Sequence, residues 1–294
     1  MTARQAGVSG QLRSQLRGTP LHRWWRYAAS AAGAFRRRSV LDEVRTYSLF
    51  IGHARSGHSI VGALLDAHPQ IAISDELDAI EYVAAGFSRR QVLYLSVAIA
   101  EHQARQQRRK AGRDGKVYSY FVSGQWQGRH ERLQVVGDSH AGWTTRRLSS
   151  DPALLPRLEQ RMAGLDLRFI HVMRNPYDNI ATMMIRGERT FESAFAQYFD
   201  NCAAIVPLST RIGTDRLIRL RHEDVIEHPR ETLTRACGFL GVVPSEGYLE
   251  ACAGILYGSP SRSRGQVTWS DAQVEQVRAN IERYEFLSGY RFEE

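Results

Sequence analysis

The residues with the clearest chemical potential lie between Gly52 and Ser59, where the sequence reads G-x-x-x-x-G-H-S. This spacing follows the phosphate-binding loop pattern G-x-x-x-x-G-K-[ST], in which backbone N–H groups and the start of a helix surround a phosphate. The loop carries one fixed cation, Arg55, together with the small residues Ser56 and Gly57. We therefore expect this stretch to bind a phosphate or sulfate group.

His58 stands where the pattern requires lysine. A lysine reaches the terminal phosphates of a nucleoside triphosphate with a permanent charge, whereas an imidazole is charged only when it is protonated. Arg55 can supply the missing fixed charge. An ordinary strand-to-helix turn that uses glycine for backbone freedom would show the same octet, so the interpretation depends on the rest of the chain.

Asp75 and Glu76 follow the short apolar run 71–73. In an open α/β sheet the carboxyl ends of the strands form the ligand crevice, so Glu76 is expected to enter the same crevice as Arg55. A carboxylate at that place could act as a general base. The alternative is that Ser74 or Asp75 only caps a helix that begins near Glu76.

Asp138 and His140 follow a third apolar run, residues 133–136. Asp138 has the position of the acid that holds magnesium in phosphate-loop NTPases. His140 is a second candidate for the general base. The simpler interpretation is that His140 is a polar surface residue without a catalytic role.

A second anion site is predicted at the end of the strongest apolar run, residues 167–174. Asn175 and Pro176 are typical of the first positions of a helix, so Arg174 would lie at a strand end beside a helix start. Thr182 lies two helical turns further on. The polar loop 259–265 carries the last two candidates, and it could cover a bound nucleotide; they are Arg262 and Arg264.

Short apolar strands that alternate with helical patterns must position these residues. This alternation predicts an α/β protein: a P-loop-like three-layer α/β/α fold with a central, mostly parallel sheet of about four or five strands. Residues 79–109 read as one long helix, and residues 79–132 as an insertion that contacts substrate. The expected strands are 48–51, 71–73, 133–136, 167–174 and 218–221, and the later helices are 230–240 and 268–286.

The composition is that of a globular protein, with 294 residues of which 43% are hydrophobic and 24% charged. The net charge of +8 comes from residues 1–40, which hold eight arginines and no acid. We therefore expect a basic aromatic arm, residues 1–44, before one domain, residues 45–294, and no nucleic-acid-binding fold. The arm could lie on a membrane surface, or it could be a frayed extension with a short packed helix.

The three cysteines form no C-x-x-C pair, which favours buried thiols in a reducing compartment such as the cytoplasm. The histidines never fall at a paired-ligand spacing, so we expect no metal site. No segment is long and apolar enough to span a membrane.

Three stretches together resemble the sulfotransferases that use 3′-phosphoadenosine 5′-phosphosulfate (PAPS). FIGHARSGHSIVGALLDAHP, residues 50–69, is similar to the family's 5′-phosphosulfate loop. FIHVMRNPYDNIATMM, residues 169–184, is similar to its 3′-phosphate motif, in which an arginine and a serine or threonine eight residues later bind that phosphate. RHEDVIEHPRETLTRACGFLGV, residues 221–242, resembles the family's Arg-Tyr-Glu-Asp-Leu segment and the helix after it. The likeness is closest to the tyrosylprotein and bacterial branch.

The resemblance implies transfer of a sulfonate from PAPS to a hydroxyl or amine, leaving 3′,5′-ADP (PAP) and needing no metal. It implies that Arg174 and Thr182 bind the 3′-phosphate, and that Glu76 is the base, with Asp75 or His140 as alternatives. His58 replaces the family's threonine, and could donate to a sulfonate oxygen in its place. The residues implied to hold the 5′-phosphosulfate are Arg55, Ser56, Gly57, His58 and Ser59.

The acceptor is left open as a small molecule, a lipid, a sugar or a phenol. The aromatic residues between 112 and 128 are compatible with an apolar or phenolic acceptor. Two other functions fit parts of the pattern. A P-loop nucleotide kinase would use Asp138 and magnesium, and a catalytically degenerate relative would only bind an anionic partner.

Overall fold

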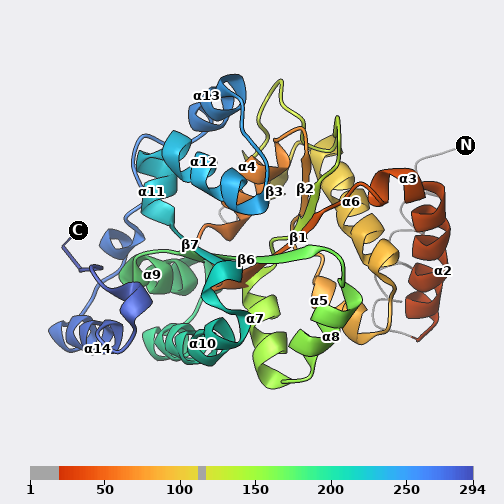
Figure 1. Ribbon diagram of the computed structural model, residues 1–294. Helices are drawn as coiled ribbons and strands as arrows, with labels where there is room; N and C mark the ends of the chain where they lie inside the picture. The colour runs from red at the N-terminus through yellow and green to blue at the C-terminus, as the bar shows by residue number, and fades with distance from the viewer. Residues whose placement is uncertain (1–19, 112–116, 294) are drawn as a thin grey trace, which may run out of the picture.

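The structure, a computed structural model, describes residues 20–111 and 117–293. Its central sheet has five strands, and every neighbouring pair is parallel. Figure 1 shows this sheet between two layers of helices, so the expected fold class is confirmed. In their order across the sheet the strands are β2 (Ile71–Ser74), β5 (Val135–Asp138), β1 (Thr46–Gly52), β6 (Asp166–Met173) and β7 (Leu217–Arg221).

Successive residues of β1 face opposite layers. Phe50 packs in one hydrophobic cluster with Leu64, whereas Leu49 packs in another with Val92. Burial on both faces explains why the strand is a continuous apolar run. The first layer contains α4 (His58–Asp66), α11 (His222–Glu227), α12 (Pro229–Leu240) and α13 (Glu246–Gly254). The second contains α5 (Ala79–Ala84), α6 (Arg89–Arg105), α7 (Ala141–Ser150), α8 (Leu154–Arg161) and α10 (Phe191–Ile212).

A third hydrophobic cluster joins α9 (Pro176–Gly187) and α10 to α14 (Asp271–Ile281) and the C-terminal segment. Asn175 caps α9 as expected, because its side chain accepts a hydrogen bond from the Tyr177 amide at 3.1 Å. The last helix is shorter than predicted, since α14 ends at Ile281 and a 3-10 turn follows at Glu285–Leu287.

The expectation of one long helix over residues 79–109 is wrong. The chain breaks between α5 and α6 at Gly86, whose φ of 86° is a left-handed value that suits glycine. Ser88 then caps α6 through a capping box with Gln91. Past α6, β3 (Arg109–Ala111) and β4 (Val117–Ser119) form an antiparallel pair.

The described part of the arginine-rich arm is packed on the domain. It forms α2 (Pro20–Arg36) and α3 (Arg38–Leu41), which lie against α6 at the side of the molecule in Figure 1. Ala34 and Leu41 are buried in the same cluster as the sheet residue Leu49. Residues 1–19 of the arm lie outside the described residues. Where the chain is described, no helix has the length and apolarity needed to cross a bilayer.

Candidate functional site

The strand order fixes which groups are neighbours along the carboxyl edge of the sheet. Asp75 follows β2 and Ser139 follows β5, while the loop 53–57 follows the central strand β1. Arg174 and His222 follow β6 and β7 on the other side of that loop. The loop therefore separates a carboxylate half of the edge from an arginine half.

The loop 53–57 turns sharply at three positions with left-handed backbone. The φ angles are 127° at Gly52, 66° at Arg55 and 93° at Gly57. Gly57 is the N-cap of α4 and no side chain caps this helix, whose positive dipole end favours an anion. A Cβ at Gly57 would lie only 2.3 Å from Nδ1 of His222. The arrangement suits the close approach of an anion to the backbone.

Side chains from two helices hold the start of the loop. Thr145 accepts a hydrogen bond from the Gly52 amide at 2.8 Å, and Asn201 donates to the Gly52 carbonyl at 2.6 Å. The ring of His53 lies 3.2 Å from the carbonyl oxygen of Tyr198. Burial lowers the pKa of His53 to about 4, so this ring is neutral at physiological pH. These anchors make the loop a rigid part of the sheet edge.

His58 is turned back onto the loop. Its Nδ1 lies 3.2 Å from the carbonyl oxygen of His53, and the side chain is buried. A carbonyl can only accept, so Nδ1 carries a proton and a neutral His58 has a lone pair at Nε2. A neutral His58 in this pose therefore cannot donate to a sulfonate oxygen. This contact ties the start of α4 to the loop that precedes it.

Arg174 is the centre of a buried polar cluster, with 7% of its surface exposed. Its guanidinium donates to the hydroxyls of Thr182 and Ser263, both at 3.1 Å. It also donates to the carbonyls of Arg55 at 3.2 Å and Ser261 at 2.8 Å. Burial lowers the pKa of Arg174 from its ordinary value. The predicted Arg174 and Thr182 are thus brought together, one step from the loop.

Of the two arginines in the loop 259–265, only one is exposed. Arg262 lies at the surface, whereas Arg264 is buried and pairs with Asp178 at 3.1 Å. Arg264 also donates to the carbonyls of Arg291 and Phe292. Arg264 therefore ties the loop to α9 and the C-terminal segment, while Arg262 has a side chain that could reach a ligand.

Sequence reasoning missed Ser263 and His222. Ser263 stands between the two arginines that drew attention to its loop, and a small polar residue in a polar loop gives no signal of its own. His222 opens α11, and its Nδ1 is buried with no hydrogen-bond partner among the described residues. Burial, helped by the nearby Arg174 charge, lowers the pKa of His222 to about 4. A neutral ring therefore packs against Gly57.

On the carboxylate half, Asp75 is buried and Glu76 is exposed. Oδ1 of Asp75 accepts hydrogen bonds from the hydroxyls of Ser59 and Ser139, both at 3.2 Å. Asp75 is thus joined directly to the first turn of α4. Glu76 has a φ of 64°, which is uncommon for a residue with a side chain and marks a conformation that the surroundings impose.

Asp138 imposes that conformation. Its carboxylate is fully buried and accepts hydrogen bonds from the amides of Leu77 at 3.1 Å and Ala79 at 3.0 Å, and from the Ser74 hydroxyl at 3.1 Å. Glu76 lies between these tethered residues. Desolvation raises the pKa of Asp138 to about 6. Asp138 is therefore directed into the protein, not toward the crevice where a magnesium ion would be needed.

His140 is half-buried at the start of α7. Its Nδ1 makes no hydrogen bond within the described residues, and its ring lies 6.4 Å from that of Trp143, which is 48% exposed. His140 therefore lies on the same half of the edge as Asp75. Among the described residues, no group of three or more His, Cys, Asp or Glu side chains could hold a metal ion.

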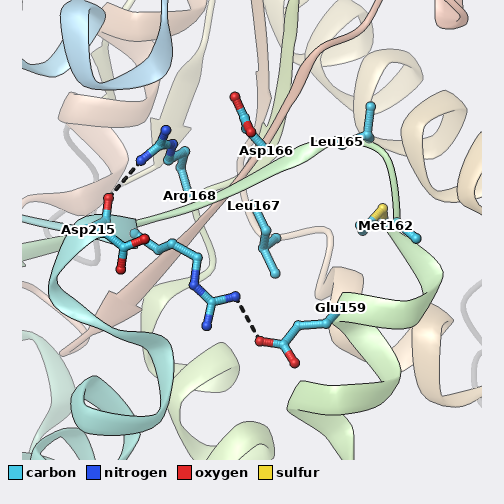
Figure 2. A pocket seen from close by; sticks show the side chains of 9 residues that line it. Glu159, Met162, Leu165, Asp166, Leu167, Arg168 and Asp215 are labelled. Atoms are coloured by element: carbon cyan, nitrogen blue, oxygen red, sulfur yellow. Dashed lines mark hydrogen bonds and ion pairs between the residues drawn. The ribbon is translucent and has the colours of Figure 1, made fainter.

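A hollow lies at the amino ends of the strands, opposite the carboxyl edge described above. It has a volume of about 310 Å³, and Figure 2 shows its charged lining at the amino end of β6. Arg216 pairs with Glu159 at 2.8 Å, and Arg168 donates to the carbonyl of Asp215 at 2.7 Å. Ligands of parallel α/β sheets bind at the carboxyl edge, so this hollow is not the candidate active site.

The chain matches the model of one protein family, the sulfotransferase family, over residues 49–246. No curated protein matches it. Among the similar solved structures is the sulfotransferase domain of the Synechococcus PCC 7002 olefin synthase, with 20% sequence identity, a TM-score of 0.45, and coverage of 80% of this chain and 88% of that chain. Sulfotransferase STF9 from Mycobacterium avium has 12% identity and a TM-score of 0.48, and the match covers 87% of this chain and 81% of that chain. A mouse sulfotransferase complexed with PAP has 11% identity and a TM-score of 0.44, and the match covers 83% of this chain and 87% of that chain.

Proposed function

The chain belongs to the sulfotransferase family, and we propose that it transfers the sulfonate group of PAPS to a hydroxyl or amine of an acceptor. One observation carries the donor assignment. The Arg174–Thr182–Ser263 cluster is joined to the loop that leads into α4, because Arg174 donates to the carbonyl of Arg55. Two anion sites joined in this way suit a donor with two separate phosphate groups.

The residues on the arginine half fit the 3′-phosphate of the donor. Arg174, Thr182 and Ser263 offer a guanidinium and two hydroxyls in one buried cluster, and exposed Arg262 can add a second charge from the covering loop. Charge-assisted hydrogen bonds of this kind are the strong ones in anion binding. Arg174 also donates to the carbonyls of Arg55 and Ser261, so its guanidinium is held between the loop 53–57 and the covering loop.

The loop itself fits the 5′-phosphosulfate. Its amides and those of the first turn of α4 would hold the group, with Arg55, Ser56 and Ser59 around it. The donor would supply a sulfonate already activated by its anhydride bond to the phosphate. The ring of His222 packs so closely against Gly57 that a residue with a Cβ would not fit there, so glycine is needed for this loop conformation. Fixed donors at the bridging oxygen would stabilise the charge that develops on the leaving phosphate.

Glu76 is the proposed base. It would take the acceptor's proton while the acceptor oxygen bonds to sulfur and the bond between sulfur and the bridging phosphate oxygen breaks, which leaves PAP. Asp138 holds Glu76 in place through the amides of Leu77 and Ala79. Asp75, hydrogen-bonded to Ser59, links the base to the donor loop. His140, at the start of α7, is the alternative base.

Donor binding tests this proposal directly. PAP without metal should raise the melting temperature of the protein, because a ligand that binds only the folded state stabilises it. Labelled PAPS with a panel of acceptors should then give a labelled product. If ATP with Mg²⁺ stabilises the protein and PAP does not, a nucleotide kinase is the better description. PAP binding without transfer to any acceptor would identify a degenerate binding protein.

A further inference from the structure

A small hollow opens beside Asp75, between α4 and the end of α6. It has a volume of about 130 Å³. We call it the acceptor hollow. The lining residues used below are Ser59, Asp75, Gln103, Gln106, Arg109 and Tyr120.

The inner wall of the acceptor hollow is a rigid polar network. Gln103 accepts from the Asp75 amide at 3.0 Å and donates to the Asp75 carbonyl at 2.6 Å. Arg108, which is 5% exposed, donates to Gln103 at 2.9 Å and to the carbonyl of Ile73 at 3.0 Å. A buried ion pair with Asp66 fixes Arg108 in turn. The position of Asp75 is therefore set before any acceptor arrives.

The lining combines several polar groups with apolar surface from Ala63 and Tyr120. It offers a carboxylate at Asp75, a hydroxyl at Ser59, an amide at Gln106 and a guanidinium at Arg109, with the half-buried ring of Tyr120 as its aromatic surface. A sterol or acyl chain would displace water from Gln106 and Arg109, which lie at the surface, without replacing the hydrogen bonds of that water. A molecule with several hydroxyls around one ring can satisfy both the donors and the acceptors.

The location fits the chemistry of the proposed reaction. Ser59 lies in the first turn of α4 and bonds to Asp75, and Glu76 is the next residue. A ring seated in the acceptor hollow would thus contact Ser59, in the helix turn that follows the proposed donor loop, and Asp75, the residue before the proposed base. The volume admits about one six-membered ring, so a longer glycan would extend into solvent.

We propose that the acceptor hollow binds a single sugar ring, and that the acceptor is a carbohydrate or glycoside. The inference rests on the proposed function. One ring hydroxyl forms the new bond to sulfur, its proton passes to Glu76, and PAP leaves with the electrons of the broken bond. Asp75, Gln106 and Arg109 bind the other hydroxyls, and Tyr120 packs against the ring face.

Saturation-transfer NMR with the full chain tests this inference, using methyl glycosides of glucose, galactose and N-acetylglucosamine against phenol and a soluble sterol sulfate. At least one glycoside should bind, and Gln106→Leu and Tyr120→Ala should each weaken it about tenfold, the value of one or two lost contacts. The exposed Gln276→Leu on α14 is the matched control and should change nothing. Binding of the phenol or sterol alone, or glycoside binding that both variants leave unchanged, would overturn the inference.

Two readouts separate this inference from the proposed function. The PAP-induced rise in melting temperature reports the donor site, and it should be the same in Gln106→Leu and in the parent protein. Glycoside binding is measured without a donor. If glycosides bind in the acceptor hollow but PAP has no effect, the proposed function fails and the sugar site stands. If PAP binds and no glycoside does, the sugar site fails alone.

Discussion

The Arg174 guanidinium donates a hydrogen bond to the hydroxyl of Thr182, 3.1 Å away and eight positions later in the chain. Thr182 in turn donates to the Asp178 carbonyl at 2.8 Å, the preceding turn of α9, and lies 3.0 Å from the hydroxyl of Ser263. A strand end, a helix and a distant loop therefore meet at one arginine. Because Arg174 is buried, its charge needs a compensating anion more than a surface arginine does.

Replacing Arg174 should reduce donor affinity strongly. Arg174→Ala should weaken PAP binding by roughly 100-fold or more, the usual effect of deleting a buried charged partner. Arg174→Lys keeps the charge but loses the fork of donors, so its affinity should fall between those of the alanine variant and the parent. Isothermal titration calorimetry with PAP measures both. Arg157→Ala, at an exposed site on α8, is the control; unchanged PAP affinity in Arg174→Ala would remove this residue from the donor site.

Gly57→Ala should damage the loop for two reasons. The φ of 93° strains any residue with a Cβ, and that Cβ would lie 2.3 Å from Nδ1 of His222. We expect a loss of about 2 kcal/mol or more in the free energy of unfolding, together with loss of PAP binding. Gly238→Ala in α12 meets no atom within 4 Å and should be neutral or slightly stabilising. Urea unfolding of both variants makes the comparison, and equal stabilities would contradict the argument.

The sequence allowed the fold class to be predicted because β1, β2 and β5 are buried along their whole length, on both faces. Such strands are continuous apolar runs, as at Leu49 to Ile51, and their ends need turn residues such as Gly52. The break at Gly86 was missed because the apolar spacing continues across it. The left-handed backbone at Gly86 separates α5 from α6, and the amino-acid composition of the segment does not predict that conformation.

Contacts within one strand–helix unit of the candidate site could be predicted from the sequence, whereas contacts between distant segments could not. Arg174 and Thr182 are eight residues apart on a strand and its following helix, so their contact follows from local geometry. Ser263 and His222 reach the same place through tertiary packing of distant segments, which no spacing encodes. The inward direction of Asp138 depends on the amides of Leu77 and Ala79, a contact across more than fifty residues.

The two carboxylates after β2 should have separable effects. Glu76→Gln should lower the rate of sulfonate transfer by about 100-fold or more, the contribution of a general base, and leave PAP affinity nearly unchanged. Asp75→Asn keeps the size of the side chain that accepts hydrogen bonds from Ser59 and Ser139 but removes its charge. Because Asp75 is proposed to bind the acceptor, this variant should mainly raise the KM for the acceptor. Steady-state kinetics with the identified acceptor distinguish these effects. A comparable rate loss in His140→Ala, with Glu76→Gln active, would move the base to His140.

Protonation of Asp138 should make stability depend on pH. Its pKa is about 6 in the folded protein and near 3.8 in the unfolded chain, so folding favours the protonated form. The resulting stabilisation is complete below about pH 4 and is lost as the pH rises through 6, for a total of at most about 3 kcal/mol. Asp138→Asn does not titrate. The free energy of unfolding of the parent protein relative to this variant should therefore fall between pH 4 and pH 6 and stay level above pH 7.

Urea unfolding at a series of pH values measures that difference directly. The comparison with Asp138→Asn cancels the titration of other buried acids such as Asp66, whose pKa burial also raises. Asp151→Asn, at an exposed site, should run parallel to the parent protein across the series. A parent curve parallel to that of Asp138→Asn would show that Asp138 stays ionised in the folded protein. The three hydrogen bonds it accepts would then outweigh the cost of burying its charge.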